Sequence, residues 1–151
     1  MHKIVLHLLM VLIFLAFASE ASPQYFDHSK YIDSTINSTN KKKDLIVLKK
    51  KQENITYVFT KSKQLFAVQV RKAVPDSAVI ITYFFIREEI AKIRLGIGRK
   101  LAPKHGSADY YFFNGEMIKK IEKGVVTLEF ETVVKQGYDL ASKAREALPG
   151  E

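Results

Sequence analysis

The sequence predicts an α+β fold: an antiparallel β-meander of about six strands, in three hairpin repeats, covered by a C-terminal helix. Three observations predict it. Aromatic segments recur at intervals of 26 to 28 residues, and each is followed by a short polar break and a second apolar run. Apolar residues near the C-terminus recur at helical spacing. The chain of 151 residues is 47% hydrophobic and 26% charged, which is ordinary for one globular domain.

The first 21 residues have the pattern of a secretory signal peptide. Lys3 supplies a basic start, residues 4–18 are almost entirely apolar, and small residues stand before a cleavage point after Ala21. Cleavage after Ala18 satisfies the same rule. A retained membrane anchor is the rival interpretation, but the apolar run is short for a full span. We therefore expect a single exported domain over residues 22–151, with no transmembrane span in the mature chain.

The chain contains no cysteine. This composition excludes disulfide scaffolds, thiol nucleophiles, zinc-finger ligand sets and iron–sulfur sites, and it excludes a lipoprotein, whose acyl acceptor is a cysteine. Small exported proteins of eukaryotes usually depend on disulfides. The absence of cysteine therefore favours a bacterial source, with the chain periplasmic or secreted.

Each aromatic segment begins a predicted hairpin. Aromatic and β-branched residues around a short polar break are typical of hairpins, and Asn114-Gly115 is the strongest turn signal because both residues tolerate positive φ. Residues 78–86 are apolar on both faces, so we expect that strand at the centre of the sheet. The aromatic segments are residues 55–59, 81–85 and 108–113, and the polar breaks after them are residues 61–63, 87–89 and 114–115.

Two further elements are expected near the N-terminal side of the domain. Residues 44–49 favour an additional leading strand, and residues 24–36 favour a short helix. Within the fourth strand of the hairpins, Lys92 and Arg94 alternate with apolar neighbours. We expect one face of the meander to lie on a core and the other to be partly exposed to water.

The C-terminal apolar stripe supplies a cover for the core face. Thr127 is the expected N-cap, and Pro149 follows the expected end of the helix. Residues 126–131 also alternate as a seventh strand would, so helix and strand both remain open there, with Thr132 as the later helix start. The stripe consists of Phe130, Val133, Val134, Gly137, Leu140, Ala141, Ala144 and Leu148.

The hairpin over residues 110–120 resembles small exported proteins of Bacteroidota-type bacteria. Many of those carry hairpins of the form Tyr-Tyr-Phe-x-Asn-Gly-x-x-Ile-Lys and have no assigned activity. The resemblance covers one clear hairpin and two degenerate ones, under half of the chain. Because its motif encodes a turn, the resemblance implies no catalytic or binding residue.

The basic charge is concentrated in one segment. Formal net charge is +8, and residues 41–72 hold ten basic residues against the two acidic residues Asp44 and Glu53. Residues 22–40 and 73–151 are close to neutral. The segment therefore forms a candidate patch for an anion or a partner, at the ends of neighbouring strands. Its basic residues are Lys41, Lys42, Lys43, Lys49, Lys50, Lys51, Lys61, Lys63, Arg71 and Lys72.

Such a patch suits an anionic envelope polymer, a lipid surface or an acidic protein partner, at about 1 kcal/mol per lysine near a charged membrane. Nucleic acid fits less well, because the basic residues are mostly lysines without interleaved aromatics. The competing interpretation is structural, since lysines on an edge strand block aggregation between sheets.

No motif in the chain predicts a catalytic, cofactor or metal site. His105 precedes Asp109 in a loop, where a solvated histidine is the ordinary interpretation. Glu88-Glu89 lies at a hairpin tip, and residues 96–100 lack the third glycine of a phosphate loop. The recurring tyrosines are either an exposed aromatic platform or, more ordinarily, the core of the sheet.

The leading hypothesis is therefore an exported, non-catalytic binding or interaction module of the bacterial envelope or exterior. An inhibitor of an exported hydrolase is the first alternative, with a hairpin tip or the basic strand inserted into an acidic cleft. A small enzyme that uses His105 is the second alternative.

Overall fold

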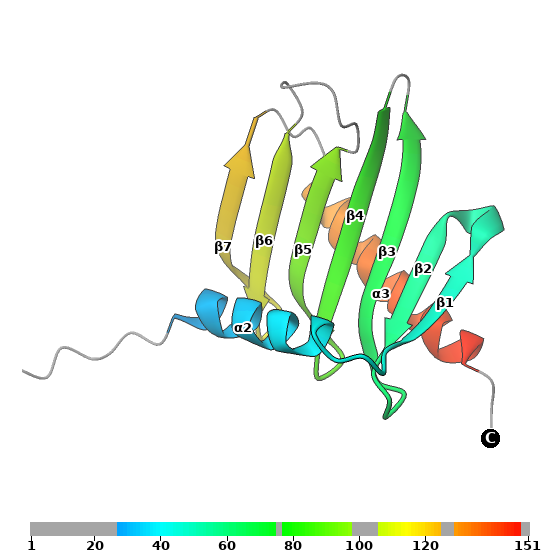
Figure 1. The fold of residues 1–151 in the computed structure, drawn as a ribbon. Coiled ribbons are helices and arrows are strands. Elements are labelled where there is room, and N and C mark those ends of the chain that lie inside the picture. Colours follow the sequence, from blue (N-terminus) through cyan, green and yellow to red (C-terminus); the bar gives the residue numbers. More distant parts are fainter. Residues whose placement is uncertain (1–26, 75–76, 98–105, 125–128, 149–151) are drawn as a thin grey trace, which may run out of the picture.

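A computed structural model describes residues 27–74, 77–97, 106–124 and 129–148. Seven strands form one antiparallel sheet, in which every strand pairs with its neighbours in the sequence (Figure 1). The predicted α+β meander with a C-terminal helix is confirmed. The strands are β1 (Ile46–Lys50), β2 (Ile55–Phe59), β3 (Leu65–Val74), β4 (Ser77–Ile86), β5 (Glu89–Ile97), β6 (Ser107–Phe113) and β7 (Glu116–Lys123); the helices are α2 (His28–Asn40), α3 (Phe130–Ala147) and the short 3₁₀ helix η1 (Lys51–Glu53).

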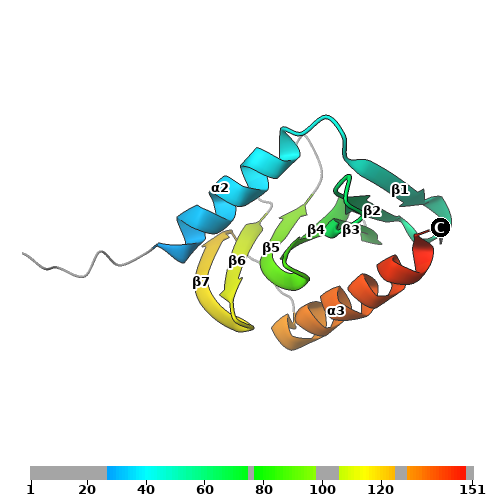
Figure 2. The ribbon, with the colours of Figure 1, turned by 90° about the horizontal axis from the view of Figure 1, so that it is seen from below.

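The two long helices lie on opposite faces of the sheet (Figure 2). On one face, α3 packs on the larger core, which contains Tyr57, Tyr83 and Ile93. On the other face, Ile32 and Ile36 of α2 pack on a smaller cluster of sheet side chains. The expectation of a single covered face is therefore incomplete, because the short N-terminal helix begins and ends later than predicted and covers part of the second face. That smaller cluster contains Phe66, Ala67, Phe84, Ala91 and Tyr111.

The hairpin turns confirm the predicted repeat. Asn114 and Gly115 have φ values of 51° and 77°, as a type I′ turn requires. Arg87 and Glu88 adopt the same left-handed conformation, with φ values of 53° and 69°, although neither residue type favours it. The apolar strand β4 lies in the middle of the sheet, as its two-sided apolar pattern predicts.

The helices begin at positions that local chemistry explains. The Asp27 carboxylate caps α2 by accepting hydrogen bonds from the backbone N–H groups of Ser29 and Lys30. The N-cap of α3 is Glu129, so the predicted cap at Thr127 and the later start at Thr132 are both wrong. The alternative of a strand also fails from Glu129 onward, since apolar residues that repeat every three to four positions bury a helix face on the core.

Several sequence predictions fall outside the described residues. These are the signal peptide with both cleavage points and the part of the possible seventh strand over residues 126–128. Helix α3 ends at Ala147 with Leu148 as its C-cap, directly before Pro149, as predicted. Within the residues that the structure describes, no helix has both the length and the hydropathy that a membrane span requires.

Candidate functional site

The structure divides the ten basic residues of segment 41–72 between the two ends of the β1–β2 hairpin. Antiparallel pairing of Ile46 with Phe59 brings the approach to β1 beside the β2–β3 turn. At the other end, the Arg71 N–H donates to the Asn54 carbonyl, which places that part of β3 beside η1. We name these groups the turn cluster (Lys41, Lys42, Lys43, Lys61, Lys63) and the η1 cluster (Lys49, Lys50, Lys51, Arg71, Lys72).

The charge of both clusters is largely uncompensated. All ten side chains are exposed, and, Lys63 aside, none of them belongs to an ion pair among the described residues. Lys72 Nζ instead donates to Gln136 Oε1 at 3.1 Å, and Lys50 Nζ lies 5.9 Å from the centre of the Tyr57 ring. Exposed ammonium groups without carboxylate partners create a positive potential that attracts anions.

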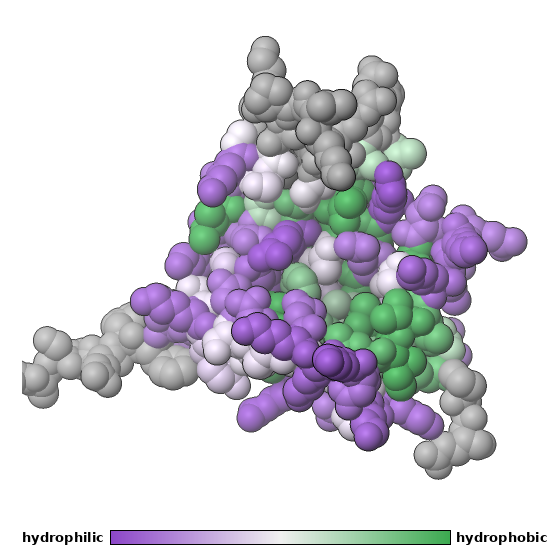
Figure 3. Space-filling view, viewed as in Figure 1, coloured by the Kyte–Doolittle hydropathy of each residue, from purple (hydrophilic) through white to green (hydrophobic). Residues whose placement is uncertain are grey.

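Exposed apolar side chains lie between the two clusters. On edge strand β1, Ile46 is 37% exposed and Val47 is 49% exposed. Figure 3 shows a hydrophobic area at the lower right, between hydrophilic side chains at the β2–β3 turn below and near η1 above. The β1 edge therefore has an apolar centre, with Ile46 on one face of the strand and Val47 on the other, and a basic cluster at each end.

The recurring tyrosines belong to the core, as the ordinary interpretation holds. Tyr57 and Tyr83 are fully buried, and Tyr110 and Tyr111 are nearly so. The Tyr110 hydroxyl donates to Glu122 Oε1 at 2.8 Å. Burial, followed by this contact with a carboxylate, raises the pKa of Tyr110 to about 12. An aromatic platform built from these residues is excluded.

A buried lysine between α2 and the sheet is the main polar feature that the sequence did not reveal. Lys92 on β5 is 1% exposed, and its Nζ donates to Asp33 Oδ1 and to the Tyr111 hydroxyl, both at 2.7 Å. Asp109 Oδ2 lies 3.1 Å from the same Nζ, and its other oxygen accepts from Arg94 Nε at 3.0 Å. The group therefore joins α2, β5 and β6 through charge-assisted hydrogen bonds.

The electrostatics of this group favour its charged state. Burial alone would lower the pKa of Lys92, but hydrogen bonds to Asp33, Tyr111 and Asp109 outweigh it, so the pKa is raised. Burial would raise the pKa of Asp109, but Arg94 and Lys92 outweigh it, so the pKa is lowered. A lysine held as a cation is not a nucleophile or a base, so the group is better suited to holding α2 than to catalysis.

The remaining candidate residues do not assemble into a catalytic or metal site among the described residues. His105 and residues 98–100 lie outside them. Glu88 accepts a hydrogen bond from Arg145 of α3 at 3.2 Å, which ties the β4–β5 turn to that helix. No group of three or more histidine, aspartate or glutamate side chains in the described ranges is placed to hold a metal ion.

Comparison with known proteins adds no functional assignment. No family model, curated protein or solved structure matches the chain.

Proposed function

We propose that this chain is an exported, non-catalytic module that attaches to an anionic lipid surface through its β1 edge. The observation that supports the proposal is that Ile46 and Val47 are exposed between two exposed basic clusters. Lysines near an anionic bilayer contribute about 1 kcal/mol each, and their long alkyl stems let the ammonium groups stay at the headgroups while apolar neighbours enter the interface.

The apolar centre is what favours a lipid surface over a charged polymer. An anionic polysaccharide would pair with the ammonium groups, but it offers little apolar surface to cover two exposed aliphatic side chains. Burying such side chains at an interface contributes about 25 cal/mol per Å² of apolar area. A lipid surface would therefore contact both the basic clusters and the exposed apolar side chains of the β1 edge.

A flotation experiment with vesicles tests the charge. The protein released by a bacterial export host, its N-terminus fixed by mass spectrometry, is mixed with phosphatidylcholine vesicles with or without phosphatidylglycerol. K49E/K50E/K51E should weaken binding to the anionic vesicles by at least about 100-fold, since three attractive charges become repulsive. The matched control K123E/K135E/K143E changes net charge equally, on exposed residues of β7 and α3, and should retain most binding.

A single substitution tests the apolar centre. V47S should weaken vesicle binding while leaving retention on dextran sulfate, a soluble polyanion, unchanged. Equal losses for the two charge-reversal triples would contradict the proposal and leave the lysines as a solubility device. Stronger retention on the polyanion than on vesicles, with no effect of V47S, would favour a polymer ligand instead. Stoichiometric capture of one exported hydrolase, with no vesicle binding, would favour the inhibitor hypothesis.

A further inference from the structure

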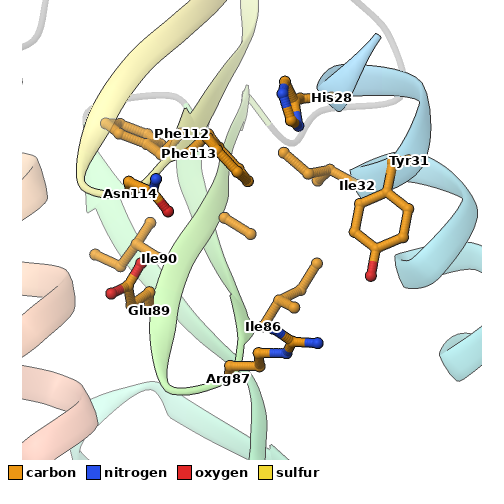
Figure 4. A pocket seen from close by; sticks show the side chains of 11 residues that line it. His28, Tyr31, Ile32, Ile86, Arg87, Glu89, Ile90, Phe112, Phe113 and Asn114 are labelled. Atoms are coloured by element: carbon orange, nitrogen blue, oxygen red, sulfur yellow. The ribbon is translucent and has the colours of Figure 1, made fainter. Parts of the chain in front are cut away.

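A groove of about 470 Å³ lies between the first half of α2 and the turn ends of the β4–β5 and β6–β7 hairpins (Figure 4). Its volume is within the range of small-molecule sites in proteins. Buried or half-buried apolar side chains from α2, β4 and β5 line its inner part, whereas neither basic cluster contributes to it. These side chains are Ile32, Ile86 and Ala91; Ile90 and Phe112 also border the groove, but their side chains pack in the larger core on the other face of the sheet.

The rim of the groove carries charges of opposite sign. Arg87 and Glu89 line it from the end of the β4–β5 hairpin, and neither forms an ion pair among the described residues. In Figure 4 the guanidinium lies on the side of α2, and the carboxylate lies on the side of Asn114. A bound molecule that spans the groove would therefore meet a cation on its α2 side and an anion on its Asn114 side.

The conformation of the β4–β5 turn is costly and places Arg87 at this rim. Arg87 and Glu88 both have positive φ, which costs side chains other than glycine about 1 kcal/mol each. The β6–β7 turn reaches the same conformation with Asn114-Gly115, at little cost. Glu88 pairs with Arg145 of α3, whereas Arg87 has no ion-pair partner among the described residues, so the strain retained at Arg87 points to a role for its side chain.

Two of the exposed large side chains of the protein also line the groove. Tyr31 is 47% exposed and Phe113 is 42% exposed, and the His28 ring stacks on Phe113 with 4.0 Å between ring centres. Apolar surface that remains exposed beside an apolar floor offers a favourable contact to an apolar ligand.

We propose that this groove binds a small apolar zwitterion, an amino acid or dipeptide with a large aliphatic or aromatic side chain. The Glu89 carboxylate accepts hydrogen bonds from the ligand's ammonium group, and the Arg87 guanidinium donates to its carboxylate. The ligand's side chain covers Ile32, Ala91 and the exposed face of Phe113. This site is separate from the β1 edge, so the proposal does not depend on lipid attachment.

Calorimetric titration of the full chain tests the site. The probes are L-phenylalanine, the dipeptide Phe-Leu, and the two singly blocked forms N-acetyl-L-phenylalanine and L-phenylalaninamide. At least one free zwitterion should bind saturably, and blocking either end should weaken binding about tenfold, because one charge-assisted contact is lost. R87Q should bind L-phenylalaninamide and L-phenylalanine with equal affinity. E89Q should bind N-acetyl-L-phenylalanine and L-phenylalanine with equal affinity.

Matched variants separate loss of the site from loss of the fold. K135Q and E131Q remove one exposed charge each on α3, outside the groove, and should keep wild-type binding. Thermal unfolding shows whether R87Q and E89Q remain folded. The proposal is overturned if no zwitterion binds the folded wild-type chain at up to about 10 mM, tenfold above a Kd of about 1 mM. It is also overturned if blocked and free forms bind equally.

Discussion

Replacing Lys92 with methionine tests how α2 is held on the sheet. The Lys92 ammonium lies 2.7 Å from Asp33 Oδ1, 2.7 Å from the Tyr111 hydroxyl and 3.1 Å from Asp109 Oδ2. Methionine keeps most of the buried volume and the flexible stem, but it removes the only cation that joins the two carboxylates among the described residues. In this variant Asp109 keeps its ion pair with Arg94, whereas Asp33 loses its ion pair with Lys92.

The structure sets the size of the effect. Removing one partner of a fully buried ion pair costs about 3–5 kcal/mol. The Asp33 and Asp109 side chains are 42% and 25% exposed, so water reaches both carboxylates, and we expect K92M to lower the free energy of unfolding by about 2 kcal/mol. The double variant D33N/D109N leaves the ammonium at 1% exposure with only neutral partners, and should cost more, about 3–4 kcal/mol.

The triple variant K92M/D33N/D109N decides between a charge effect and a packing effect. If the cost comes from an uncompensated buried charge, removing all three charges should recover much of the loss seen in D33N/D109N. Urea unfolding of the full chain at pH 7, with an unchanged m-value, measures all three free energies. A double variant that costs less than K92M, or a triple variant that is as unstable as the sum of the two, would refute this reasoning.

Three further outcomes follow from the packing, the turns and the tyrosines. G137A should destabilise by about 1–3 kcal/mol in thermal unfolding, because a Cβ there would lie 2.6 Å from Cδ1 of the buried Tyr83 ring. The double variant R87N/E88G should raise the free energy of urea unfolding by about 1 kcal/mol, because relief of positive-φ strain outweighs the loss of the exposed Glu88–Arg145 ion pair. A loss of stability larger than in E88Q, which removes the ion pair alone, would contradict that strain. The folded pKa of Tyr110 is raised from 10.0 to about 12, so its contribution to stability is present below pH 10 and is lost as the pH rises towards 12. Stability measured across pH 9–12 should therefore fall less steeply in Y110F.

The strands and their order could be predicted from the sequence because the two strands of a hairpin are neighbours along the chain. Each aromatic run pairs with the run that follows it, and the register is set by a two-residue turn such as Asn114-Gly115. The leading strand and the central position of β4 likewise follow from short-range patterns. The start of α3 was less accessible, because Phe130 fits both the alternation of a strand and the stripe of a helix, and only packing on Phe112 and Tyr110 distinguishes them.

The polar group around Lys92 was inaccessible because its partners are distant in the sequence. An exposed lysine on a wet strand face and a buried lysine beneath a helix have the same alternation with apolar neighbours. Asp33 lies 59 positions from Lys92, and nothing local indicates that α2 covers this residue. The groove was missed for the same reason, since its lining comes from α2 and two hairpins. The concentration of basic residues in segment 41–72 could be predicted from the sequence. Their division between the two ends of a hairpin could not, because it depends on strand pairing.

The positions of the two proposed sites constrain how they can work together. Edge strand β1 and the η1 cluster lie away from the groove, which lies at the turn ends of β4 to β7. The turn cluster lies at the same end of the sheet as the groove, because Ala67 of β3 pairs with Phe84 of β4. Neighbouring strands are about 4.8 Å apart, so at least about 14 Å of sheet separates β1 from the nearest wall of the groove. A chain attached to a membrane by the β1 edge therefore keeps its groove open to water. Phenylalanine should bind with the same affinity in the presence and absence of anionic vesicles, and competition between the two would show instead that both ligands use one surface.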